Sequence, residues 1–152
     1  MRQMMQPGER SADWARMVGF ATLVGLSFAA PASADDAAQN VSVTLVRQDF
    51  SDCTNGNVSD RDPSLDGGTA WVARQQDGTT VVKVGMTVKP DTTYHFFLKC
   101  VRLLGDIRTD DEGIGQAVFT FQTNSVGAVF GFDIYPDGAP LGNKFQSVQV
   151  GF

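Results

Sequence analysis

Apolar and polar residues alternate along most of the chain after residue 40, with the period of two that half-buried β-strands produce. No window in this part shows sustained helical periodicity, and β-branched and aromatic residues are frequent throughout. Asn-Gly, Asp-Gly and Pro-Asp pairs interrupt the alternation, as turns do. The pattern predicts seven strands, at residues 41–45, 69–75, 80–88, 94–103, 116–122, 126–135 and 145–152.

These strands each carry one apolar face, which a single flat sheet would leave in water. Two packed sheets bury such faces, so we expect an all-β domain built as a single antiparallel two-sheet β-sandwich of about seven strands. Within residues 94–103 the phase places His95 and Lys99 in solvent. The inward positions include Tyr94, Phe96, Leu98, Cys100, Phe119, Phe121, Ala128, Phe130, Phe132 and Ile134.

The first 34 residues have the pattern of a secretory signal peptide. Arg10 and Arg16 precede an apolar run at 17–30, which ends in Pro31-Ala32-Ser33-Ala34. The run is too short to span a bilayer comfortably, so cleavage after Ala34 is favoured over an uncleaved anchor, and no membrane insertion is expected. The sequence therefore predicts a secreted or periplasmic protein with a cleaved leader (1–34), a disordered start (35–40) and one domain (41–152).

The part beyond the leader is acidic. Of the chain's 12 basic and 17 acidic residues, three and two lie in the leader, which leaves nine basic and fifteen acidic side chains. Such a surface repels phosphate backbones, so nucleic acid is not expected as a partner. Solubility is the simplest interpretation of the charge.

Two cysteines, Cys53 and Cys100, follow the leader. In an oxidising compartment a pair of this kind is expected to form a disulfide, and only one pairing is possible within the chain. A redox-active pair lacks its usual Cys-x-x-Cys spacing. We expect the bridge to join the loop after the first strand to the fourth strand.

Three carboxylates lie close together in the sequence, at Asp60, Asp62 and Asp66. Carboxylate oxygens are ligands for Ca²⁺, so these residues are a candidate cation site. The EF-hand spacing is absent, because Arg61 and Pro63 intervene and no glutamate closes the loop. A solvated, turn-rich loop is the alternative, and we expect no metal and no cofactor.

Catalytic groups are scarce. The chain has one histidine, His95, and Glu112 is the only glutamate after the leader. General-base catalysis needs a nucleophile and an orienting group beside the base, and the sequence marks neither. We interpret His95 as an exposed strand residue and expect no catalytic residues.

The segment Pro90-Asp91-Thr92-Thr93-Tyr94 resembles the Pro-x-Thr-x-Tyr corner of immunoglobulin-like and fibronectin type III-like domains. The resemblance implies an immunoglobulin-like sandwich in which the Tyr94 hydroxyl bonds back to nearby backbone. It implies no function. In size, acidity and export the chain is also similar to the enediyne-carrier apoproteins, which hold two disulfides where this chain can form one.

These features predict a non-enzymatic exported module that binds a protein or a small ligand through its loops or a sheet face. Phe97, Val101 and Val129 lie on the outward phase and would form an apolar patch if they shared one exposed sheet face. The alternatives are a small hydrolase or metal-dependent enzyme, and a purely structural surface component.

Overall fold

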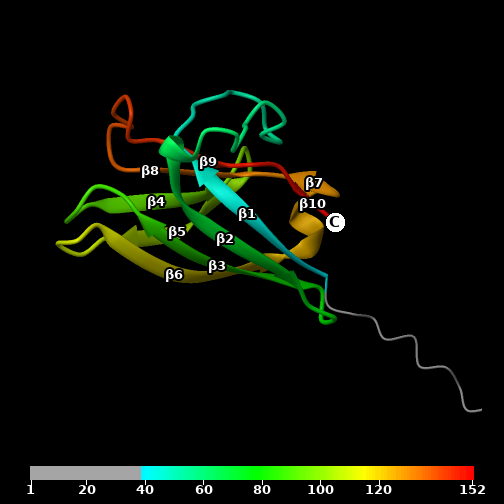
Figure 1. The fold of residues 1–152 in the computed structure, drawn as a ribbon. Helices are drawn as coiled ribbons and strands as arrows, with labels where there is room; N and C mark the ends of the chain where they lie inside the picture. Colours follow the sequence, from blue (N-terminus) through cyan, green and yellow to red (C-terminus); the bar gives the residue numbers. More distant parts are fainter. Residues whose placement is uncertain (1–38) are drawn as a thin grey trace, which may run out of the picture. The chain divides into compact units, whose positions relative to one another are not determined.

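The computed structural model describes residues 39–152, and the predicted leader and residues 35–38 lie outside the described residues. The described chain is all-β and antiparallel (Figure 1). Its strands are β1 (Asn40–Val46), β2 (Asp66–Arg74), β3 (Thr79–Thr87), β4 (Thr93–Leu98), β5 (Arg102–Arg108), β6 (Ile114–Gln122), β7 (Val129–Phe130), β8 (Phe132–Tyr135), β9 (Phe145–Ser147) and β10 (Val150–Gly151). Two short 3₁₀ turns, η1 (Pro63–Leu65) and η2 (Thr123–Ser125), complete the elements. Asn40 was expected in the disordered start at 35–40, but it is the first residue of β1.

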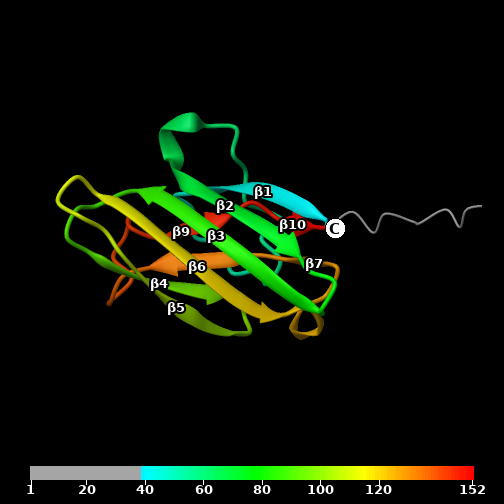
Figure 2. The same cartoon turned by 90° about the horizontal axis from the view of Figure 1, so that it is seen from below.

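Eight of the strands form one sheet in the order β5-β4-β8-β9-β1-β2-β3-β6, and β7 and β10 form a separate two-stranded sheet. Figure 2 shows β1, β2, β3 and β6 side by side. The predicted antiparallel all-β class is confirmed, but the two-sheet sandwich is wrong. The eight-stranded sheet is nearly closed and barrel-like, so it buries its own inner face by curling.

The edge strands β5 and β6 meet because they are consecutive in the chain. In the turn between them the Asp110 amide donates to the Ile114 carbonyl over 3.0 Å. Beside this turn β6 lies against β5 so tightly that a Cβ added to Gly115 would lie 2.9 Å from Cγ2 of Ile107. A glycine at this position therefore lets the two sheet edges approach.

Further along the same edge, Phe119 of β6 packs against β4 and β5. Its ring stacks on Phe96 with centroids 4.9 Å apart, and a Cβ added to Gly105 would lie 2.7 Å from its Cε1 atom. Phe96 stacks in turn on Phe132 at 4.9 Å. The core inside the curl is therefore a run of aromatic rings contributed by β6, β4 and β8.

The inward phase predicted for most strands is confirmed, since Val43, Val82, Phe96 and Phe121 are buried. The strand predicted at 94–103 is wrong: it is a hairpin of β4 and β5 with its turn at 99–101. The strands predicted at 126–135 and 145–152 are each split in two, and Ala128, expected inward, is exposed.

Candidate functional site

The three loop carboxylates are not gathered into a cation site. Asp62 caps η1, where its Oδ1 accepts hydrogen bonds from the Ser64 amide and hydroxyl, and these bonds lower the pKa of its carboxyl. Asp60 accepts a long hydrogen bond from the Thr44 hydroxyl, and Asp66 begins β2. Among residues 39–152, no three His, Cys, Asp or Glu side chains form a group able to hold a metal ion.

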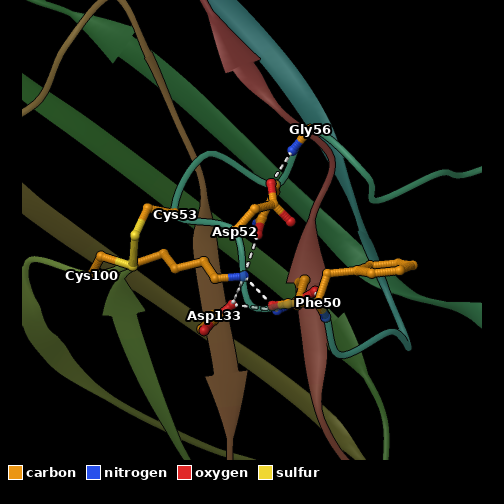
Figure 3. The surroundings of a disulfide bond; sticks show 9 residues. Phe50, Asp52, Cys53, Gly56, Cys100 and Asp133 are labelled. Carbon is orange, nitrogen blue, oxygen red and sulfur yellow. Dashed lines mark hydrogen bonds and ion pairs between the residues drawn. A yellow bond between two sulfur atoms is a disulfide. The ribbon is translucent and has the colours of Figure 1, made fainter.

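The two cysteines form the single bridge that the chain allows, with Cα atoms 5.5 Å apart (Figure 3). The alternation predicted that Cys100 lies within a strand, and this is wrong. Cys100 lies exposed in the turn between β4 and β5 with a left-handed backbone at φ 58°. The bridge therefore fixes the loop after β1 onto this turn.

Lys99, expected in solvent, is buried with only 6% of its surface exposed. Its Nζ donates to the Phe50 carbonyl over 2.6 Å and to Asn55 Oδ1 over 2.7 Å, and lies 3.5 Å from Asp133 Oδ1. Figure 3 shows Phe50 and Asp133 beside the disulfide. The expectation was wrong because the chain turns at Lys99, so its side chain reaches under the loop held by Cys53.

The rest of this buried network also holds the loop. The side-chain oxygen of Gln146 accepts a hydrogen bond from the Phe50 amide, and its Nε2 donates to the Phe50 carbonyl, both over 2.8 Å. Asn55 is fully buried and donates to the carbonyls of Phe132 and Ser147. Burial raises the pKa of the Asp133 carboxyl, while Lys99 opposes the shift. Each polar group has a partner within the protein, so we interpret the network as structural.

His95 lies on β4 between two carboxylates. Its Nδ1 lies 2.7 Å from Asp106 Oδ1 and its Nε2 lies 2.9 Å from Asp137 Oδ1. The hydrogen bond to Asp106, and then that to Asp137, raise the pKa of the imidazole. Both ring nitrogens therefore contact carboxylates in this structure.

Tyr94 is buried, and its hydroxyl accepts a hydrogen bond from the Lys89 amide over 3.3 Å. The hydroxyl also donates to Asn143 Oδ1, on the segment between β8 and β9. Burial raises the pKa of the phenol. The tyrosine therefore joins the start of β4 to two neighbouring segments.

The apolar patch considered for Phe97, Val101 and Val129 does not form on one sheet face. Phe97 lies on β4, half-buried and stacked on Tyr135 with centroids 4.8 Å apart. Val101 lies in the turn before β5, and Val129 belongs to β7 in the other sheet. Val101 is exposed and lines an open hollow with Phe97 and Leu103, whereas Val129 is exposed in the other sheet.

A different exposed aromatic surface lies on the outer face of β1, β2, β3 and β6. We call it the Trp71 face and define it by three rows of paired residues across these strands. The rows are Asn40, Ala73, Val81 and Thr120; Ser42, Trp71, Lys83 and Val118; and Thr44, Thr69, Gly85 and Gln116. Trp71, near the centre, is 50% exposed, and Val118 is 63% exposed.

Two open hollows flank the indole, and Trp71 and Lys83 line both. The first, of about 440 Å³, extends over β1 and also contacts Ser42. The second, of about 400 Å³, extends over β6 and also contacts Gln116 and Val118. A half-exposed indole between two hollows is the arrangement in which a ligand ring gains contact area.

The charges of the Trp71 face differ from those of the remaining surface. Lys83 is the only charged residue in its three rows, and none of the acidic residues falls there. Within residues 39–152, no acidic side chain forms an ion pair with Lys83. The face therefore offers one free cation beside one exposed aromatic ring.

The sequence interpretation placed Trp71 in a strand but did not single it out. The signal was present, because Trp71 takes the outward phase of its strand with Thr69 and Ala73. Examining only the outward positions of the four strands would have shown an acid-free surface around one tryptophan.

No family model matches the chain, and no curated protein matches it significantly. Within the described residues 39–152, no helix is long and apolar enough to cross a membrane.

Proposed function

We propose that this protein is a non-enzymatic exported binding module whose ligand docks on the Trp71 face. The half exposure of Trp71 between two hollows is the observation that carries this proposal. Exposed aromatic rings in surfaces depleted of charge are typical of binding sites. Export rests on the leader pattern, and the disulfide is compatible with it.

The rigidity of the face supports the same conclusion. All three rows lie on paired strands, so the backbone under the ligand is fixed before binding. The Trp71 ring is held close to the backbone of β3, since a Cβ added to Gly85 would lie 3.4 Å from its Cζ3 atom. A preformed site of this kind loses little conformational entropy when it binds.

Catalysis is less well supported. The one histidine has both nitrogens engaged by carboxylates, and the buried lysine donates to protein atoms. Neither group faces the hollows beside Trp71, whose lining residues do not include them. A hydrolase would need a base or a nucleophile at the ligand.

The proposal is tested by immobilising the protein and passing the extracytoplasmic fraction of its native host over it. Protein and carbohydrate retained by the wild type are compared with those retained by Trp71→Ala and by Val129→Ala. Val129 is the matched control, an exposed apolar residue 40% accessible and outside the face. We expect Trp71→Ala alone to lose the retained material. Equal retention by Trp71→Ala would refute the proposal, and so would no retention by the wild type.

A further inference from the structure

We infer that the ligand of the Trp71 face is a saccharide carrying an acidic sugar unit, with a sugar ring stacked on Trp71 and its carboxylate paired with Lys83. The inference rests on the proposed function and names its ligand class. Three features of the face carry it: the lie of the indole, the short polar side chains around it, and the single cation.

The indole lies against the sheet and leaves a surface open. The atoms Cζ3 and Cη2 lie 3.4 and 3.6 Å from the place where a Gly85 Cβ would be, so the six-membered ring lies over Gly85 of β3. A flat, fixed apolar surface fits the flat face of a sugar ring, whose C–H groups point toward the electron-rich face of an aromatic ring.

The three rows combine apolar residues with short hydroxyl and amide side chains. The polar members are Ser42, Thr44, Thr69, Gln116 and Thr120, all exposed or half-exposed, and the Thr44 hydroxyl donates to Asp60. Hydroxyls both donate and accept hydrogen bonds, and the Gln116 amide does so through separate atoms. Ser42 lines the hollow over β1 and Gln116 the hollow over β6, so a ligand rich in hydroxyl groups finds a polar partner on each side of the indole.

The charge pattern selects an acidic ligand. Lys83 pairs with Trp71 across β2 and β3, and it lines both hollows that flank the indole. Asp60 contacts the rows at the Thr44 hydroxyl, but no acidic side chain of residues 39–152 forms an ion pair with Lys83. A carboxylate on the stacked sugar supplies an ion-pair partner, and the pairing would fix the orientation of the ring.

The same charges disfavour two other occupants. Two copies packed face to face through Trp71 would bring two Lys83 ammonium groups together with no acid between them. A dense polyanion would meet the acidic remainder of the protein, whose described residues are more acidic than basic. A sugar chain with isolated carboxylates avoids both conflicts.

The test uses tryptophan emission. The chain has two tryptophans, Trp14 and Trp71, so Trp14→Phe makes Trp71 the only reporter whether or not the leader is removed. The probes are cellobiouronic acid, digalacturonic acid and cellobiose. Cellobiose differs from cellobiouronic acid only in having a hydroxymethyl group where the acid has its carboxylate. Val129→Ala serves as the folded control variant.

We expect a saturable change in emission with at least one acid. Where cellobiouronic acid binds, it should bind roughly two- to five-fold more tightly than cellobiose, the gain that an exposed ion pair provides. Lys83→Gln should remove this gain without changing the affinity for cellobiose, and high salt should reduce it. Val129→Ala should titrate like the parent.

Three results would overturn the inference without refuting the proposed function. If cellobiose binds as tightly as the acid and Lys83→Gln has no effect, the acidic unit is wrong. If no disaccharide changes the emission throughout its soluble range while Trp71→Ala still loses material from the host fraction, the ligand is not a saccharide of this class. If protein is the only material that the wild type retains, the ligand is likewise not a saccharide of this class. If Trp71→Ala retains the same material as the wild type, the proposed function fails as well.

Discussion

Lys99 and Asp133 form a buried ion pair, with the ammonium nitrogen 3.5 Å from a carboxylate oxygen and the two side chains only 5% and 14% exposed. The pair lies beneath the loop that Cys53 joins to Cys100. Removing one member of a buried pair leaves the other charge uncompensated, which is more costly than losing the attraction alone.

Lys99→Met should therefore lower the free energy of unfolding by about 3 to 5 kcal/mol. The change also removes the donor to Phe50 and Asn55. Lys89→Met, at an exposed lysine, is the control and should change stability by less than about 0.5 kcal/mol. Urea unfolding measures both, and equal effects would mean that Lys99 is not buried in solution.

The histidine titration has a definite sign. Hydrogen bonds to Asp106 and Asp137 favour the charged ring, so the folded pKa lies above the ordinary value of 6.5. The stabilisation that results is complete below pH 6.5 and is lost as the pH rises through the folded pKa. Since the chain has one histidine, its Hε1 proton resonance gives this pKa directly.

We expect Asp106→Asn to lower that midpoint, and Asp137→Asn to lower it as well. His95→Gln should flatten the fall in stability above pH 6.5. A wild-type midpoint at or below the ordinary value would contradict the double pairing of the imidazole.

The disulfide closes a long loop, since its cysteines are 47 positions apart in the sequence. Cys53→Ser/Cys100→Ser should lower the free energy of unfolding by about 2 to 4 kcal/mol, the usual range for such bridges. Amide exchange should rise first in residues 50–58, because the bridge and the Lys99 network hold this loop together. Unchanged exchange there would show that the loop does not depend on the bridge.

The aromatic core gives a test of strand phase. Phe96 is fully buried between Phe119 and Phe132, so Phe96→Ala should cost about 3 to 5 kcal/mol. Val118→Ala, on the outer face at 63% exposure, should cost less than about 0.5 kcal/mol. Denaturant melts in the reverse order would place β6 one residue out of register.

The strand positions were largely predictable because one face of each strand is buried. The alternation around Val43, Val82 and Phe121 reports that burial directly. The curl of the sheet was not predictable in this way, since it depends on the pairing of β8 with β4 and β9 and on the approach of β5 to β6. Alternation carries no information about which strands pair.

The error at Lys99 has a local cause. Residues 94–103 keep their alternation through the turn, and Lys99-Cys100-Val101 contains no glycine, proline or asparagine to mark it. The turn depends on the left-handed backbone of Cys100, which is joined by the bridge to a residue far away in the sequence. The loop carboxylates were misleading for the opposite reason, because neighbours in sequence such as Asp60 and Asp62 serve separate local contacts.

Amide chemical-shift mapping of the protein with the material retained from its host fraction locates the ligand and tests whether it docks on the Trp71 face. We expect shifts confined to β1, β2, β3 and β6 at the rows around Trp71 and Lys83, and their loss in Trp71→Ala. Shifts centred on His95 and Asp106, or on the turn at Cys100, would contradict this expectation.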